Sequence, residues 1–228
     1  MSPCHRPVQT IALALSAALL VACNPPGYRS IIRVEQSGQY YYSIGDYDTA
    51  AKEFGEVVNR SPGLWQTRVD LAKSYMKAGK YPEAREQLEV VYTIRPNEPG
   101  VLDMLAESMV ASGDVDAMAG ELRRQADQRQ TVSDWMRLGV FMHKAGDHDS
   151  AESALLTAAR LDRGRNLGPQ LALANMYRDV GETASALDRY RMALYIKPRD
   201  PAIQQAIRDL GAIPGPTYAL VPIERGSN

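Results

Sequence analysis

The chain has 228 residues, of which 45% are hydrophobic and 23% are charged, and its formal net charge is −1. This composition is typical of globular proteins and excludes disorder along the whole length. A chain so close to neutral lacks the basic excess that attracts a phosphate backbone. We therefore expect no nucleic-acid partner.

The first predicted element is an apolar segment near the N-terminus. Ile11 to Ala22 form an uncharged run that follows His5 and Arg6. A transmembrane helix needs about 20 apolar residues, and this run is shorter. A short apolar run behind a basic residue is typical of a signal peptide, so we predict that residues 1–22 are a signal peptide.

The end of this segment reads Leu20-Val21-Ala22-Cys23 and resembles the lipobox of bacterial lipoproteins. The resemblance implies cleavage before Cys23 and attachment of a diacylglyceryl group to its thiol. Residues 23–30 would then be the lipidated cysteine and a linker that contains two prolines. The alternative is an ordinary secretory signal with an incidental cysteine. Cys4 lies in the removed segment, so we expect no free thiol in the mature chain.

From Ile31 the sequence repeats. Five glycines recur at spacings of 33 to 35 residues: Gly45, Gly79, Gly113, Gly146 and Gly181. Seven residues before each glycine stands a small residue: Gly38, Ala72, Ala106, Gly139 and Ala174. Nine residues after each glycine stands a large residue: Phe54, Leu88, Leu122, Leu155 and Tyr190. Small residues allow two helices to approach closely, so each copy is predicted to be a helix, a turn and a second helix.

A period near 34 with this order of small, large, glycine and proline residues resembles the tetratricopeptide repeat family. The resemblance implies an all-α, right-handed solenoid, here of five repeats plus a C-terminal capping helix, over residues 31–210. The capping helix is predicted at Ala202 to Leu210, and residues 211–228 are expected to be an extended or disordered tail. The third copy departs from the pattern at Met118, Gln125 and Gln130, either by drift or because it reshapes the surface.

In this family the first helix of each pair lines a concave groove. The resemblance therefore implies a partner groove lined by residues of the first helices: Gln39, Tyr42, Lys73, Met76, Asp103, Glu107, Met136, Val140, His143, Leu171, Asn175 and Arg178. Exposed apolar residues among them would mark a binding site. The alternative is that some of them pack between neighbouring repeats.

Few residues suggest catalysis. The chain has three histidines, and His5 lies in the predicted signal peptide, so we expect no metal site, no cofactor and no catalytic residues. His148 occupies the turn position held by Tyr47 and Tyr81 in other copies, and we expect it to face the core. The chain is predicted not to be an enzyme.

Together these patterns favour a noncatalytic protein–protein interaction scaffold, anchored by lipid in the cell envelope, that binds envelope proteins or peptide segments in its groove. A lipobox with five such repeats resembles the lipoproteins of pilus assembly, which implies an adaptor for a pilus or secretion machine. Asn24, rather than aspartate, follows the cysteine, which favours the periplasmic face of the outer membrane. The alternatives are an adaptor for peptidoglycan hydrolases or polysaccharide export, and an accessory subunit of an envelope enzyme. The sequence leaves the oligomeric state open.

The lipobox gives a direct prediction. Cells fed a radioactive fatty acid are expected to label the wild-type protein and to leave the Cys23→Ser variant unlabelled, because the serine oxygen replaces the thiol that accepts the lipid. Label that persists on the variant would contradict lipidation at Cys23.

Overall fold

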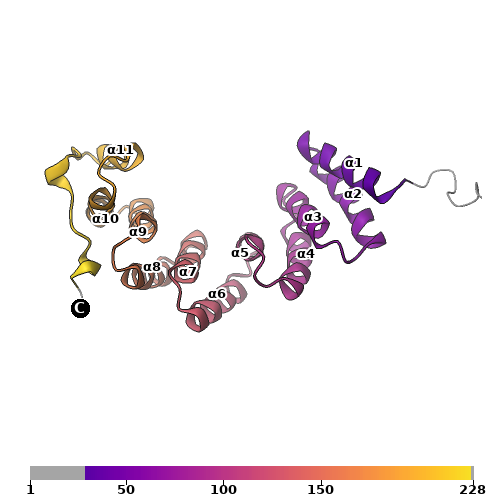
Figure 1. Cartoon of the computed structure of the whole chain (residues 1–228), viewed down its shortest axis with the longest axis horizontal. Helices are drawn as coiled ribbons and strands as arrows, with labels where there is room; N and C mark the ends of the chain where they lie inside the picture. Colours follow the sequence, from indigo (N-terminus) through magenta and orange to yellow (C-terminus); the bar gives the residue numbers. More distant parts are fainter. Residues whose placement is uncertain (1–28, 227–228) are drawn as a thin grey trace, which may run out of the picture. The chain divides into compact units, whose positions relative to one another are not determined.

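The computed structural model describes residues 29–226. Within that range the chain forms eleven α-helices and two short 3-10 helices, and it contains no strand (Figure 1). The predicted signal peptide, Cys23 and the linker up to residue 28 lie outside the described residues. None of the helices in the described part of the chain is long and apolar enough to cross a membrane.

The helices follow the predicted order of pairs. Their bounds are α1 (Ile31–Ser43), α2 (Tyr47–Arg60), α3 (Trp65–Lys77), α4 (Tyr81–Ile94), α5 (Val101–Ser112), α6 (Val115–Arg129), α7 (Val132–Lys144), α8 (His148–Asp162), α9 (Leu167–Asp179), α10 (Thr183–Ile196) and α11 (Pro201–Asp209). The first ten correspond to the five predicted repeats. The predicted capping helix is α11, which packs on α10 and buries Ile203 and Ile207.

The chain divides into two compact units, residues 1–74 and 75–228, with the boundary inside α3. In the first unit α1 and α2 pack against each other. In the second unit α7 with α8, and α9 with α10, form the most extensive helix pairs, and α7 also touches the first helices α5 and α9. The expectation of a single solenoid over residues 31–210 stays a prediction.

The five aligned glycines lie in the turns between paired helices, as predicted. Their φ angles are all positive, from +74° at Gly79 to +87° at Gly146. This left-handed conformation is unfavourable for residues that carry a Cβ atom, so glycine is required for the tight turn. The regular spacing of these glycines therefore follows from a tight turn at the same position in each repeat.

In two helix pairs a small residue of the first helix packs against a large residue of the second. Gly38 of α1 faces the ring of Phe54 of α2, where a Cβ atom on the glycine would lie 2.8 Å from Cε1. Gly139 of α7 faces Leu155 of α8, and a Cβ atom there would lie 2.5 Å from Cγ. Phe54 and Leu155 are both almost completely buried. The predicted role of the small residues is thus confirmed in these two pairs.

The second helices end in two different ways. A proline follows α2, α4 and α10 within two residues, at Pro62, Pro96 and Pro198. The two copies without this proline end on a residue in the left-handed conformation, Gln130 after α6 and Arg163 after α8, with φ of 51° and 54°. A left-handed residue satisfies the last carbonyls of a helix as glycine commonly does.

The loop between α8 and α9 is short. The helix α8 ends at Asp162 and α9 begins at Leu167, with Pro169 in its first turn. Proline is tolerated there because the N–H groups of the first turn have no partner within the helix. The buried carboxylate of Asp162 fixes the loop by accepting hydrogen bonds from the backbone N–H groups of Arg165 and Asn166, both at 2.7 Å.

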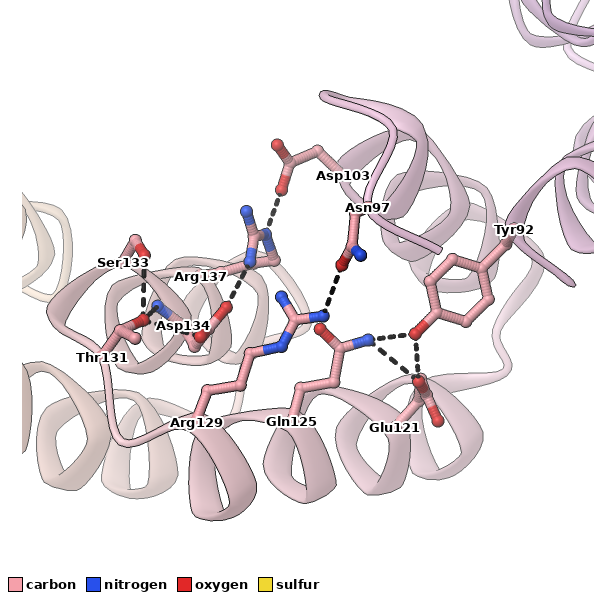
Figure 2. A network of polar contacts seen from close by, with 10 residues as sticks. All are labelled: Tyr92, Asn97, Asp103, Glu121, Gln125, Arg129, Thr131, Ser133, Asp134 and Arg137. Carbon is pink, nitrogen blue, oxygen red and sulfur yellow. Dashed lines mark hydrogen bonds and ion pairs between the residues drawn. The ribbon is translucent and has the colours of Figure 1, made fainter. Parts of the chain in front are cut away.

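The third repeat contains polar contacts where the others have apolar ones (Figure 2). Tyr92 of α4 donates a hydrogen bond to Glu121 of α6 at 2.8 Å, and Gln125 Nε2 donates to both Tyr92 and Glu121. Gln125 is buried, and its Oε1 atom has no hydrogen-bond partner among the described residues. In the same repeat α5 and α6 are in less extensive contact than α1 with α2, α7 with α8, or α9 with α10. The sequence departure therefore coincides with looser packing.

The described part of the C-terminal tail is held against the helices. From Gly211 to Gly226 it contains only the 3-10 helices η1 (Pro216–Tyr218) and η2 (Ile223–Arg225), and it runs back from α11 past α10 to α8 (Figure 1). Leu220 N–H donates to the carbonyl of Arg191 on α10 at 3.1 Å. The tail passes so close to Gly164 that a Cβ atom there would overlap the side chain of Pro222.

A buried ion pair holds the tail in place. Arg189 Nη1 of α10 lies 2.5 Å from Glu224 Oε1, and both side chains are less than a tenth exposed. Gln170 of α9 completes the group, because it donates to Glu224 at 3.0 Å and accepts from Arg189 at 3.0 Å. The sequence pattern gave no sign of this contact.

The close contact at Gly139 predicts opposite results for two glycine substitutions. Gly139→Ala is expected to destabilise the protein by about 1–3 kcal/mol, because the methyl group overlaps Leu155 in a packed interface. Gly120→Ala on α6 is the matched control, since no atom lies within 4 Å of its Cβ position. It is expected to stabilise the helix by roughly 0.5–1 kcal/mol. Urea unfolding measures both, and equal effects would contradict the packing.

The buried ion pair predicts a strong effect in the tail. Glu224→Ala is expected to cost about 3–5 kcal/mol, because it leaves the Arg189 charge buried without its partner. The double variant Arg189→Met plus Glu224→Leu is expected to recover most of this loss, since apolar replacements of a buried pair are often neutral. Wild-type stability of the single variant in urea would show that the tail is not attached in this way.

Candidate functional site

Six of the predicted groove residues line two pockets, one in each unit. In the first unit a pocket of about 280 Å³ is lined by Gln39, Tyr42, Phe54, Asp70 and Lys73. Buried Phe54 supplies an apolar surface, and the ring of Tyr42 is held edge-on against Tyr47 with centroids 5.3 Å apart. Lys73 pairs with Asp70 at 3.1 Å. Aromatic and charged groups therefore meet between α1 and α3.

The second pocket lies between α7 and α9 and measures about 380 Å³. Its lining residues are Val140, His143, Lys144, Leu155, Ala172, Asn175, Met176 and Asp179. Leu155 and Met176 are buried, whereas Lys144, Asn175 and Asp179 are exposed. The pocket thus has an apolar floor and a polar rim, as sites that bind organic groups usually do.

A row of polar side chains crosses the rim of the second pocket. His143 Nε2 lies 3.3 Å from Asp179 Oδ2, and its Nδ1 lies 3.1 Å from Nδ1 of His148. Asp179 also accepts a hydrogen bond from Arg178 Nη2 at 2.9 Å. Burial raises the pKa of the Asp179 carboxyl, but the hydrogen bonds from Arg178 and His143 lower it more, so its pKa lies below the ordinary value.

His148 is exposed, so the expectation that it faces the core is wrong. It is the first residue of α8, and its ring contacts His143 with centroids 5.1 Å apart. Tyr47 and Tyr81 at the equivalent positions are half-buried. The imidazole instead has a polar partner on the groove side, which the position in the repeat alone did not indicate.

The predicted groove residues Asn175 and Arg178 form hydrogen bonds with the second helix of their own repeat. The hydroxyl of Tyr190 on α10 donates to Asn175 Oδ1 at 2.6 Å and accepts from Arg178 Nη1 at 3.1 Å. Burial raises the pKa of Tyr190, which keeps the phenol protonated. These contacts fix Asn175 and Arg178 in position beside the pocket.

The remaining predicted groove residues have other surroundings. Asp103 accepts from Arg137 Nε at 2.6 Å, and Arg137 also binds the buried Asp134 at 2.9 Å (Figure 2). Glu107 is exposed, and Met76 and Leu171 are half-buried. Neither pocket includes these residues. The sequence pattern did not indicate Arg137 and Asp134, because a charged pair on one helix has the same spacing as on an ordinary solvent-exposed face.

Met136 favours the alternative of packing between repeats. Its Cε atom lies 3.2 Å from the position that a Cβ atom on Gly168 would take, at the start of α9. Met136 therefore contacts the next repeat at a glycine.

Two family models described as tetratricopeptide repeat match the sequence, one over residues 43–107 and the other over residues 171–202. No curated protein matches the sequence. The matched residues include α2 to α4, the first half of α5, most of α9 and all of α10.

Solved structures with a similar fold include a tetratricopeptide repeat protein from Parabacteroides merdae. It is 12% identical with a TM-score of 0.56, over 79% of this chain and 72% of that one. Two structures of MamA are also similar. One is 19% identical with a TM-score of 0.53, over 74% of this chain and 92% of that chain, and the other is 20% identical with a TM-score of 0.52, over 75% and 97%. These likenesses confirm the predicted all-α fold of helix–turn–helix repeats.

The pKa of Asp179 predicts a pH effect on stability. A carboxyl whose pKa is lowered by folding stabilises the protein above its ordinary pKa of 3.8 and loses this contribution as the pH falls through the lower folded value. Asp179→Asn is therefore expected to make the melting temperature less dependent on pH in acid. Asp127→Asn, on the exposed side of α6, is the matched control. An unchanged acid profile for Asp179→Asn would contradict the contacts with Arg178 and His143.

Proposed function

We propose that this chain, which is built from tetratricopeptide repeats, is a noncatalytic scaffold that binds an extended segment of another protein along its first helices. One observation carries the proposal. Residues from the first helices α1, α3, α7 and α9 line a pocket in each of the two units. The fold is typical of proteins that present such a concave surface to a partner.

The chemistry of the pockets defines the kind of segment that fits. Phe54 in one pocket, and Leu155 with Met176 in the other, offer apolar surface to a side chain. The polar groups beside them, such as Gln39 and Asn175, can bond the main chain of an extended peptide. The segment is therefore expected to place apolar side chains in the pockets and its backbone along the rims.

The envelope location is the finer part of the proposal. The lipobox at Cys23 would attach the mature chain to a membrane, and the several acyl chains of a lipoprotein give stable anchoring, whereas one chain binds weakly. With Asn24 after the cysteine, we place the protein on the periplasmic face of the outer membrane. The lipobox and the five repeats together support a role as adaptor in the assembly of a pilus or secretion machine.

Site-specific photocrosslinking tests the groove. A benzophenone amino acid at Tyr42, and separately at Val140, is expected to crosslink one envelope protein in living cells, because both side chains border a pocket. Val90, an exposed apolar residue on the second helix α4, is the matched control. A partner that belongs to a secretin or pilus complex would support the adaptor role.

Two outcomes would contradict the proposal. Equal crosslinking from Val90 would show that the first helices are not the contact surface. Crosslinks to a murein hydrolase from both groove positions would retain the scaffold but exclude the pilus or secretion role.

A further inference from the structure

The first helix exposes apolar side chains on a face that no described residue covers. Ile32, Tyr40 and Ile44 are 67%, 60% and 58% exposed. Tyr40 follows Ile32 by eight residues, and Ile44, the C-cap residue of α1, follows Tyr40 by four, so the three share one side of the helix. The terminal repeat of a solenoid ordinarily needs a polar outer surface for solubility. An apolar terminal face therefore indicates a contact.

The polar residues on this face carry one positive charge. We define the α1 outer face as Ile32, Arg33, Gln36, Tyr40, Ser43 and Ile44, all of which are exposed. Arg33 is the charged residue among them. The nearest acid on the helix, Glu35, is half-buried and accepts a hydrogen bond from Thr67 of α3 at 3.0 Å. The face is thus apolar, aromatic and cationic, without a carboxylate.

The chain is fixed to the fold directly before this face begins. Arg29 forms ion pairs with Glu53 and Glu56 of α2, both at 2.7 Å, and its carbonyl accepts from Arg60 at 2.9 Å. Five residues separate Arg29 from Cys23. Six Cα–Cα steps span at most about 20–22 Å when fully extended, so a lipid on Cys23 would keep Arg29, two residues before α1, within that distance of the bilayer.

We propose that α1 lies on the membrane surface through the α1 outer face, with Ile32 and Ile44 in the acyl boundary and Tyr40 at the headgroups. The proposal rests on the proposed lipid at Cys23. Helices of this kind bind in the interface plane by apolar burial and by attraction of basic residues to anionic lipids. Tyrosine is enriched at this depth of the bilayer. The lipid supplies the tether, and the face sets the orientation of the first repeat.

Tryptophan quenching by brominated lipid tests the contact. The full lipidated chain is reconstituted in vesicles of phosphatidylethanolamine and phosphatidylglycerol, with or without dibrominated acyl chains. Tyr40→Trp is expected to show emission shifted to shorter wavelength and quenched by the bromines. Val90→Trp, an exposed position on α4, is the matched control and is expected to show neither change. Trp65 and Trp135 give the same background in both variants.

The outcomes separate this proposal from the lipid anchor. If the vesicles float with the protein and Tyr40→Trp is quenched no more than Val90→Trp, the anchor holds and the α1 contact is wrong. If the protein does not float, the anchor itself is wrong. Emission of Tyr40→Trp that shifts without quenching, together with a dimer in sedimentation, would assign the face to a second copy of the chain. Ile32→Ser plus Ile44→Ser is expected to abolish the quenching at position 40 while flotation persists.

Discussion

The contact between a small residue on the first helix of a repeat and a large side chain on the second is the constraint on which the structure depends. At Gly38 against Phe54, and at Gly139 against Leu155, a single Cβ atom would overlap the neighbour. The contact draws the paired helices together on one side. The large side chain of each contact, Phe54 or Leu155, also lines the pocket beside its first helix.

The two ends of the described chain are secured by ion pairs of different burial. At the N-terminal end Arg29 pairs with Glu53 and Glu56 on a partly exposed surface. At the C-terminal end Arg189 and Glu224 are buried beneath the tail. Surface pairs contribute little, whereas the loss of one partner from a buried pair is costly. The tail therefore acts with α11 as part of the C-terminal cap, and the start of α1 is the more easily released end.

The third repeat shows how far the pattern can vary. Gln125 is buried where the other copies have an apolar residue; its Nε2 atom donates to Tyr92 and Glu121, and its Oε1 atom has no partner among the described residues. Hydrogen bonds depend on direction more than apolar contacts do. The contact between α4 and α6 therefore tolerates less displacement before its hydrogen bonds are lost. The sequence indicated the departure but not the partners, because Tyr92 belongs to the preceding repeat.

Periodic features of the fold could be predicted, and features without a period could not. The glycine turns, the small residues and the capping helix recur at fixed spacing, so the sequence alone located them. The tail contact joins Arg189 in the fifth repeat to Glu224, which lies 35 positions later and outside the repeats, and no pattern marks it. The exposed position of His148 depends on its neighbour His143, and the packing of Met136 depends on its neighbour Gly168. Half of the predicted groove residues line the pockets. Helix periodicity gives the helix face on which a residue lies but not the contacts of its side chain, and for this reason the other half do not.

The central claim is that the first helices form the binding surface. The most direct measurement is the affinity of the purified mature chain for a labelled peptide taken from its crosslinked partner, by fluorescence anisotropy. Tyr42→Ala and Val140→Asp are each predicted to weaken binding, and Val90→Asp on α4 is predicted to leave it unchanged. Wild-type affinity in both groove variants, or a loss confined to Val90→Asp, would contradict the account.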